Sequence, residues 1–437
     1  MSFHDITYRS AGELKLLQEE KLQTLLPWLQ EHSPFYRRLF SLHNLQPETI
    51  RRLEDLPGIP TTTKEDLQQF NWDFLCVEKN KIIEYTSTSG TLGSPVTIAL
   101  TENDLDRLAY NEQASFSTAG GSAADRYQLM LTLDRQFMAG MAYYAGARKM
   151  GAGVIRLGPG APSLQWETIF RLQPTTIVAV PSFIIKLIQY AQDHGIDLRR
   201  CSVEKAICIG EGIRNPDFSW NVLGEKIREA WNIRLYSTYA STEMQTAFTE
   251  CEEGRGGHLR PELLIVELLG DDDRPVPPGS PGEVTITTLA VEGMPLLRYK
   301  TGDICTYDTN PCACGRNSLR LSPVLGRKKQ MIKFKGTTLY PPALFDLLNG
   351  MAEIRDYVVE VSTNELGLDE VLLYLQPAAL TDDTDHRIRS WLQARLRVIP
   401  SIRYVRPEDI QRLQVTESNR KLIKFIDKRG DALPVQK

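Results

Sequence analysis

Several segments of the sequence bring together residue types that suit the binding of an anion. The segment 86–95 reads Thr-Ser-Thr-Ser-Gly-Thr-Leu-Gly-Ser-Pro, and its glycines and hydroxyl groups allow backbone and side-chain donors to point at one anion. It is not the common P-loop, because Ser94 and Pro95 follow its second glycine in place of lysine and a hydroxyl residue. Taken alone, such a loop is as typical of a flexible turn as of a phosphate site, so its meaning depends on its companions.

Four further segments carry side chains that could act together with this loop. Residues 239–243 (Tyr-Ala-Ser-Thr-Glu) follow an expected strand and offer an aromatic face, two hydroxyls and a carboxylate. Residues 298–303 (Arg-Tyr-Lys-Thr-Gly-Asp) place a carboxylate after a tight turn. Residues 326–336 begin with a turn and a guanidinium and end on a glycine, and residues 419–424 place basic side chains near the C-terminus. Together with these four segments, the first loop points more specifically to a phosphate site than its composition alone does.

Three cysteines and a histidine form a possible metal site. Cys251 and His258 are seven positions apart, and Cys312 and Cys314 are two apart, followed by a glycine. Three thiols and an imidazole are sufficient for tetrahedral Zn²⁺, and four protein ligands would leave no open position, so the site would be structural. The spacing is looser than a double C-x-x-C, so a zinc site and a set of metal-free cysteines both stay open.

The elements that must position these residues follow from the hydrophobic pattern. Leucines at three- and four-residue spacings predict a helix within residues 14–29, and from about residue 82 strands and helices alternate. Buried strands are expected at 128–133, 153–157, 176–180, 205–210 and 233–236. Strands that alternate with helices predict crossover units and a largely parallel sheet. The fold class is therefore α/β: a large N-terminal domain, 1–327, with a β-rich subdomain at 258–325, and a small α+β domain, 328–437.

Composition narrows the class of protein. The 437 residues exceed what one hydrophobic core usually organises. Lys and Arg number 51 against 55 Asp and Glu, and this balance argues against a general binder of nucleic acid or anionic membranes. No window approaches the run of about 20 apolar residues that spans a bilayer, and the first residues do not resemble a secretory signal. A cytoplasmic enzyme is therefore expected.

The order, spacing and content of these segments resemble the adenylate-forming superfamily and, within it, the phenylacetate–coenzyme A ligases. The likeness covers nearly the whole chain, from segments 33–36 and 60–64 to the ending 425–429. It implies an ATP-dependent ligase that converts a carboxylic acid into an acyl-adenylate and passes the acyl group to coenzyme A. An enzyme that loads a carrier-protein thiol would share the first step and remains the alternative. The joint presence of Lys421, Glu243 and Asp303 argues against a catalytically inactive regulatory protein.

The resemblance assigns a role to each segment. The first loop would wrap the β- and γ-phosphates of ATP through Thr88, Ser89, Gly90, Thr91 and Gly93. Tyr239 would stack on adenine, Asp303 would accept the ribose hydroxyls, and Glu243 would hold Mg²⁺, which prefers carboxylate and phosphate oxygens. Thr242 would contact the α-phosphate, and Lys421 would bridge that phosphate and the substrate carboxylate. The other nucleotide-site residues would be Gly210, Glu211, Gly212, Ala240, Ser241 and Arg327.

The resemblance also implies motion and partners. The small, mobile C-terminal domain would turn about Lys329 between the two half-reactions and present Lys335 and Gly336 for the coenzyme A step. Members of the family can carry Cys and His at the positions of the cysteine–histidine set, which favours zinc there. A homodimer is expected by resemblance, and neither nucleic acid nor a membrane is an expected partner.

The acid itself is the least determined part of this expectation. The resemblance places the acyl pocket at Phe137, Met138, Ala139, Gly140, Tyr143 and Tyr144. Relatives typically have a Gly-Gly pair and a histidine where this sequence has Ala139-Gly140 and Tyr144. The aromatic and apolar side chains favour an aryl or arylacetic acid, although a medium-chain acid would suit a similar pocket.

Overall fold

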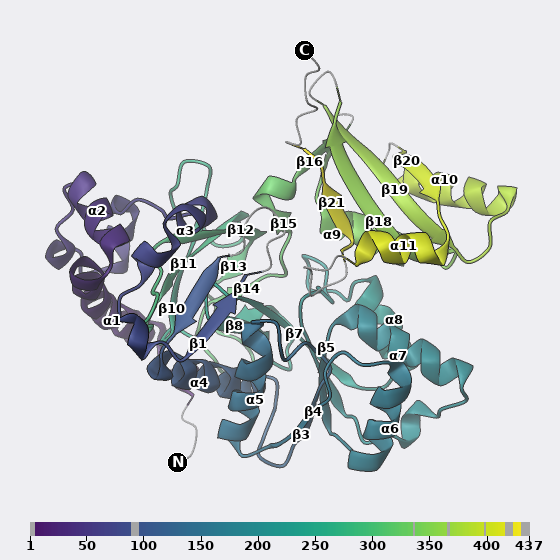
Figure 1. The fold of residues 1–437 in the computed structure, drawn as a ribbon, viewed down its shortest axis with the longest axis horizontal. Coiled ribbons are helices and arrows are strands. Elements are labelled where there is room, and N and C mark those ends of the chain that lie inside the picture. The colour runs from purple at the N-terminus through teal and green to yellow at the C-terminus, as the bar shows by residue number, and fades with distance from the viewer. Residues whose placement is uncertain are drawn as a thin grey trace. The chain divides into compact units, whose positions relative to one another are not determined.

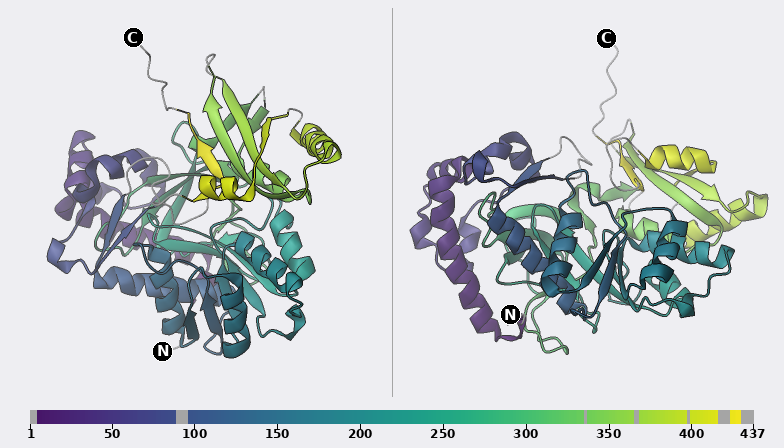
Figure 2. Two further views of the ribbon diagram at one scale, coloured as in Figure 1. Left: turned by 45° about the vertical axis from the view of Figure 1, so that its right-hand side comes forward. Right: turned by 60° about the horizontal axis from the view of Figure 1, so that its bottom comes forward.

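The computed structural model describes residues 5–88, 96–334, 337–364, 368–396, 399–415 and 423–429. The chain divides into two compact units, Met1–Val324 and Leu325–Lys437, drawn in Figures 1 and 2. The sequence-based boundary between residues 327 and 328 lies three positions further along the chain. Among the described residues, no helix is long and apolar enough to cross a membrane.

The N-terminal stretch is helical, and its helices begin at caps that the sequence encodes. Ser10 and Glu13 form a capping box at the start of the first helix, and Ser33 caps the second, which begins with a proline. The helices are α1 (Ala11–His32), α2 (Pro34–Leu42) and α3 (Lys64–Phe70), with 3₁₀ helices η1 (Ile6–Tyr8), η2 (Pro47–Thr49), η3 (Leu53–Gly58), η4 (Asn71–Phe74) and η5 (Lys79–Lys81). Leucines on one side of α1 are buried, as the spacing predicts.

A nine-stranded sheet organises the rest of the larger unit. Its strands are, in order, β13 (Tyr307–Asp308), β14 (Arg320–Leu321), β9 (Gly257–His258), β8 (Thr246–Glu250), β7 (Arg234–Ser241), β6 (Lys205–Cys208), β5 (Thr176–Ala179), β3 (Arg126–Leu129) and β4 (Gly153–Arg156). The five strands from β7 to β4 are parallel, which is the crossover sheet that the alternating pattern predicts. β5 and β6 are buried at every position, as is typical of parallel strands covered on both faces.

Helices cover both faces of this parallel part (Figure 1). On one face, Trp166, Ile184 and Ile227 form a common core from α6 (Pro162–Leu172), α7 (Pro181–Asp193) and α8 (Val222–Ala230). On the other face, Phe116 and Tyr143 pack together from α4 (Glu102–Thr118) and α5 (Met138–Met150). The helices on the two faces of the parallel sheet therefore pack in two separate hydrophobic cores.

The region that the sequence predicts to be β-rich forms an antiparallel sheet. β10 (Leu264–Leu269), β11 (Gly282–Thr288) and β12 (Tyr299–Cys305) pair in that order, and β11 is buried throughout. A separate hairpin joins β1 (Glu84–Ser87) and β2 (Thr97–Leu100), the strands on either side of the Ser/Thr/Gly loop. This hairpin fixes where that loop starts and ends.

The smaller unit is the α+β domain that the sequence predicts. Its four-stranded sheet has the order β20-β19-β18-β21, in which β18 and β19 form an antiparallel hairpin and the two outer strands run parallel to their neighbours. Its elements are β15 (Gly326–Arg327), η7 (Lys328–Gln330), β16 (Ile332–Phe334), β17 (Thr337–Leu339), α9 (Pro341–Asn349), β18 (Ile354–Thr363), β19 (Asp369–Pro377), α10 (Asp382–Leu396), β20 (Ser401–Tyr404), α11 (Pro407–Gln414) and β21 (Phe425–Asp427). The predicted α/β fold class is confirmed.

Candidate active site

Two residues predicted for the nucleotide site, Tyr239 on β7 and Asp303 on β12, meet directly. The Tyr239 hydroxyl donates to Asp303 Oδ2 over 2.8 Å, although the residues are 64 positions apart. The Tyr239 ring stacks on Phe248, with ring centroids 5.9 Å apart. Burial, with the neighbouring Asp303 carboxylate, raises the pKa of Tyr239 well above its ordinary value. The phenol is therefore a neutral donor at physiological pH and orients a carboxylate that is itself 5% exposed.

Thr242 and Glu243 follow Tyr239 by three and four positions, in the turn between β7 and β8. Ser241 holds the turn, because its Oγ accepts from the Met244 amide and its carbonyl accepts from the Gln245 amide. Thr242 and Glu243 remain partly exposed at this turn. The roles of Thr242 toward a phosphate and of Glu243 toward Mg²⁺ stay predictions from the resemblance.

The Ser/Thr/Gly loop grows out of the β1–β2 hairpin. Thr88 closes the hairpin: its amide donates to the Val96 carbonyl over 2.9 Å, and its Oγ1 accepts from the Val96 amide over 3.2 Å. The Ser87 amide donates to the carbonyl of Gln136, two residues before α5. The start of the loop is therefore tied to the segment that leads into the predicted acyl pocket. The other predicted loop residues lie outside the described residues: Ser89, Gly90, Thr91 and Gly93.

The segment 210–212 follows β6, and its carboxylate has a defined partner. Gly210 has φ 73°, a conformation that favours glycine. Glu211 accepts from the amide and from the hydroxyl of Ser182, each over 2.9 Å, at the N-terminus of α7. The Glu211 carboxylate thus caps a helix and fixes the loop, a local role that the motif itself did not indicate.

The residues predicted for the acyl pocket divide between two surroundings. Gly140 lies so close to the chain that a Cβ would be 2.4 Å from the Thr132 carbonyl oxygen, so only glycine fits there. Tyr143 is buried, and its ring centroid is 5.8 Å from that of Phe116. Tyr144 is partly exposed and lies under the Arg156 guanidinium. Phe137, Met138 and Ala139 form the start of α5, where Phe137 and Ala139 stay partly exposed.

One buried acid near this helix carried no signal in the sequence. Glu112 on α4 packs against Gly146 of α5, where a Cβ would be 2.3 Å from its own Cβ. Asn111 Nδ2 donates to Glu112 Oε1 over 2.9 Å, and Oε2 has no hydrogen-bond partner among the described residues. Burial raises the pKa of Glu112 to about 8. An Asn-Glu pair in an amphipathic helix is typical of a solvent-facing surface. Only the tertiary contact with α5 therefore reveals that Glu112 is buried.

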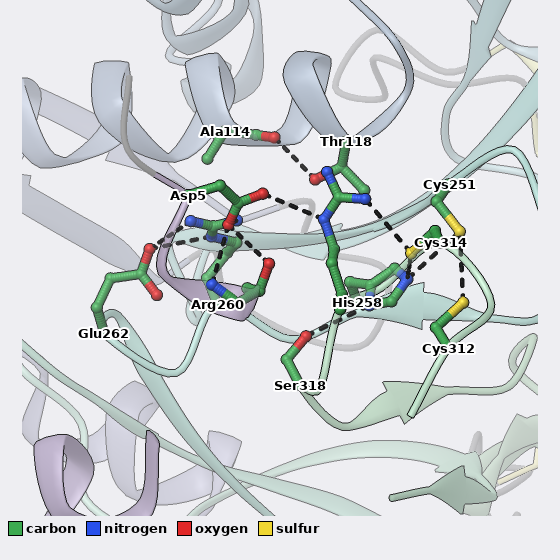
Figure 3. A network of polar contacts seen from close by, with 12 residues as sticks. Asp5, Ala114, Thr118, Cys251, His258, Arg260, Glu262, Cys312, Cys314 and Ser318 are labelled. Carbon is green, nitrogen blue, oxygen red and sulfur yellow. Dashed lines mark hydrogen bonds and ion pairs between the residues drawn. The ribbon is translucent and has the colours of Figure 1, made fainter. Parts of the chain in front are cut away.

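The four predicted metal ligands converge, as Figure 3 shows. Their ligand atoms all lie within 4.8 Å of one another. Cys251 Sγ is 3.7 Å from Cys312 Sγ, and His258 Nε2 is 3.4 Å from Cys251 Sγ and 3.6 Å from Cys314 Sγ. His258 Nδ1 is 3.3 Å from the Ser318 hydroxyl. Burial lowers the pKa of His258 to about 3, so the imidazole is neutral at physiological pH.

A network of charges joins this cluster to the N-terminal segment (Figure 3). Arg316 donates to Cys314 Sγ over 3.4 Å and to Asp5 over 3.1 Å. Asp5 also pairs with the buried Arg260, which contacts Glu262 in turn. The amide after Arg316 donates to the Thr7 carbonyl over 2.7 Å. Hydrogen bonds and ion pairs therefore connect the turn that contains Cys314 to residues 5–7 of the N-terminal segment.

The predicted residues of the smaller unit are described in part. Arg327 is exposed on β15, and Lys329 lies in η7. Lys335, Gly336 and Lys421 lie outside the described residues. Their roles in the coenzyme A step and in adenylation stay predictions from the resemblance.

Comparisons with known proteins identify the family of this chain. A family model described as AMP-binding enzyme matches residues 47–292. Phenylacetate-coenzyme A ligase of Thermus thermophilus is 30% identical over 374 residues, 83% of this chain and 81% of that protein. The Escherichia coli protein of the same name is 28% identical over 402 residues, 89% of each chain. The crystal structure of 2-hydroxyisobutyryl-CoA ligase in the postadenylation state has a TM-score of 0.83 at 23% identity, covering 96% of this chain and 91% of that one.

The chain therefore belongs to the AMP-binding enzyme family, the adenylate-forming enzymes. Within that family it is an AMP-forming acid–CoA ligase of the phenylacetate–CoA ligase type, which joins a carboxylic acid to coenzyme A through an acyl-adenylate.

Proposed function

We propose that the acid is an aryl or arylacetic acid, with phenylacetate as the first candidate, and that free coenzyme A is the acceptor. An oxygen of the carboxylate attacks the α-phosphorus of ATP and pyrophosphate leaves; the thiol sulfur then attacks the acyl carbon and AMP leaves. The hydrogen bond between Tyr239 and Asp303 is the observation that supports the nucleotide part, because it brings together the aromatic ring and the carboxylate that the resemblance assigns to adenine and ribose.

The choice of acid is supported by the relatives and by the predicted pocket. The four curated relatives at 25–30% identity are all phenylacetate-coenzyme A ligases. At the start of α5, Phe137 and Ala139, an aromatic and an apolar residue, stay partly exposed where the resemblance puts the acid. In the same proposal Glu243 holds Mg²⁺ with the phosphates of ATP, and two copies of the chain form a dimer that light scattering can test.

ATP–pyrophosphate exchange across a panel of acids tests this proposal. Phenylacetate, benzoate, hexanoate and 2-hydroxyisobutyrate are compared at equal concentration with saturating Mg²⁺ and ATP. We expect the aryl acids to give the highest kcat/KM and coenzyme A to yield the thioester without added protein. Preference for hexanoate would contradict the proposal of an aryl or arylacetic acid. Thioester formation only on a carrier protein would contradict the proposal that free coenzyme A is the acceptor. Lys421→Ala is the inactive control.

We further propose that Cys251, His258, Cys312 and Cys314 bind one Zn²⁺. A tetrahedron with Zn–S of about 2.3 Å and Zn–N of about 2.0–2.1 Å has S···S edges of about 3.8 Å and S···N edges of about 3.5 Å. The distances of 3.7, 3.4 and 3.6 Å between these atoms fit such edges. Ser318 contacts Nδ1 of His258 and leaves Nε2 directed at the thiols.

The role of this zinc would be to fasten the N-terminal segment and not to act on the substrate. Four protein ligands leave no position for water or substrate, so the ion contributes folding free energy. Arg316 links the Cys314 sulfur to Asp5, so loss of the ion would also loosen the segment that leads into α1.

Metal analysis and cobalt substitution test the zinc site. Protein purified without chelator should hold about one equivalent of zinc, and Co²⁺ in its place should give the intense visible absorption of a tetrahedral thiolate site. Cys314→Ser should lower both the metal content and Tm, whereas Cys201→Ser, which alters a partly buried cysteine outside the cluster, should change neither. Metal-free protein with an unchanged Tm would contradict the proposal.

A further inference from the structure

Arg429 uses every donor of its guanidinium, and two of the acceptors are backbone carbonyls next to the predicted hinge. Nη2 donates to the Lys329 carbonyl over 2.9 Å and Nη1 to the Met331 carbonyl over 2.6 Å. Nε and Nη2 form a bidentate pair with Asp427 over 2.9 and 2.7 Å, and Nη1 also reaches Asp369 Oδ2 over 3.1 Å. The five N–H groups of a guanidinium are thus all engaged.

The two carboxylates belong to the central sheet of the smaller unit. Asp427 is the last residue of β21 and Asp369 the first of β19 (Figure 1). The Arg429 side chain is 17% exposed and those of Asp427 and Asp369 are 9% and 13% exposed, so the ion pairs are largely withdrawn from water. The same Asp369 oxygen accepts from the Lys333 amide of β16 over 2.7 Å. Backbone from Lys329 to Lys333 is therefore fastened to the sheet at three points.

The strand that carries Arg429 is itself fixed in the sheet. The Val359 amide of β18 donates to the Lys424 carbonyl, and the Lys428 amide donates to the Val361 carbonyl, over 2.9 and 2.7 Å. Arg429 lies eight positions after Lys421, the residue that the resemblance assigns to adenylation. Strand β21 therefore begins four positions after Lys421 in the sequence and ends two positions before Arg429, which binds the backbone of the hinge.

We propose that Arg429 is a positioning residue that ends the flexible joint at Lys329. The bound carbonyls fix the peptide planes after Lys329 and Met331, so the last backbone torsions left to turn are φ and ψ of Lys329 itself. In this turn one backbone hydrogen bond spans Lys329, the 3.4 Å bond from the Met331 amide to the Lys328 carbonyl, and rotation would break it. Everything from Gln330 onward then turns with the sheet and with the segment that carries Lys421. The inference rests on the rotation between half-reactions that the resemblance implies, and it gives a physical reason for a single sharp pivot.

Lysine cannot replace this arrangement. An ammonium group is a point charge with three donors, and it cannot present a planar fork to two carboxylates and two carbonyls at once. In Arg429→Lys the carbonyls of Lys329 and Met331 would lose their donor while the positive charge is kept. The joint would then extend into residues 330–333, and the unit would reach its thioester-forming orientation less reproducibly.

Single-turnover kinetics with hydrogen exchange tests the inference, with Arg412→Lys as the matched control, because its side chain is 82% exposed on the same unit. Arg429→Lys should slow thioester formation from bound acyl-adenylate by about tenfold and adenylate formation by less than about threefold. Amides of residues 329–333 should exchange faster, and those of β18 and β19 at the wild-type rate. Arg412→Lys should match the wild type in all three measurements.

Other outcomes distinguish this inference from its premise. Equal slowing of both half-reactions, or faster exchange throughout β18 and β19, would mean that Arg429 only stabilises the fold, and would overturn the inference. Unchanged exchange at 329–333 in Arg429→Lys would overturn it as well. If the wild type forms no adenylate with any acid, the proposed function fails, and the exchange pattern still decides whether Arg429 holds the hinge backbone.

Discussion

Removal of the Tyr239 hydroxyl is the sharpest test of the nucleotide site. Tyr239→Phe keeps the ring that should stack on adenine and deletes only the donor to Asp303. The contact is 2.8 Å long and its acceptor is 5% exposed, so water replaces the donor poorly. A hydrogen bond to a charged group contributes about 1.5–3 kcal/mol, and a buried one belongs in the upper part of that range.

A double-mutant cycle isolates this contact. Tyr239→Phe, Asp303→Ala and the double variant are unfolded in urea, and the coupling energy between the two positions should be about 1.5–3 kcal/mol. AMP affinity is measured for the same four proteins. Asp303→Ala should weaken AMP binding by more than about tenfold, because the ribose hydroxyls lose a charged acceptor. For the same reason this variant should no longer discriminate against deoxy-AMP. Tyr239→Phe should weaken AMP less, because its ring remains.

The control for this cycle is Tyr127→Phe, since the Tyr127 hydroxyl contacts Met150 Sδ and not the site. Its effect on unfolding should add to that of Asp303→Ala, and AMP affinity should not change. Additive effects of Tyr239→Phe and Asp303→Ala, together with unchanged AMP affinity in both, would refute the assignment of these residues to the nucleotide site.

Two further predictions concern buried charges. The pKa of Glu112 is raised by burial to about 8 from the ordinary 4.5, so the folded protein keeps a proton that the unfolded chain releases, and stability falls as pH rises between these values. In urea unfolding between about pH 5 and 8, the free energy of unfolding of Glu112→Gln should therefore rise relative to that of the wild type by about 1.4 kcal/mol per pH unit. The same pH dependence of the free energy of unfolding in both proteins would contradict this. The Arg298 side chain is 2% exposed and forms a bidentate ion pair with Glu267. Arg298→Ala should therefore lower the free energy of unfolding by about 3–5 kcal/mol. Arg298→Met with Glu267→Leu should recover most of that loss; no recovery would mean that packing dominates.

Much of the fold could be predicted because local pattern and tertiary structure agree. The apolar run at 176–180 is β5 because it is buried on both faces, and the alternation of such runs with helices requires a parallel sheet. Helix α4 begins at Glu102 because Thr101 and Asp104 form a capping box there, a signal that the apolar spacing does not contain. Boundaries were harder to predict than element types, since capping depends on one or two side chains.

The parts that could not be predicted depend on contacts between distant segments. The pairing of Asp5 with Arg260 spans 255 positions, and nothing local to either residue indicates the other. The hydrogen bonds that Glu211 accepts from Ser182 could not be predicted either, because Ser182 belongs to another crossover unit, and the nucleotide-site role of Glu211 stays a prediction. The cluster of Cys251, His258, Cys312 and Cys314 is the exception, because the rarity and the spacing of these residues were enough to predict that they share a site.

Isotope transfer tests the central claim, ligation through an acyl-adenylate, most directly. Phenylacetate labelled with ¹⁸O in its carboxylate is incubated with the enzyme, ATP, Mg²⁺ and coenzyme A, and the nucleotide and phosphate products are analysed by mass spectrometry. Because the carboxylate oxygen attacks the α-phosphorus and stays there when the thiol displaces AMP, the account predicts AMP that carries one ¹⁸O and unlabelled pyrophosphate. Label in inorganic phosphate with formation of ADP, or thioester formation without label in AMP, would contradict it.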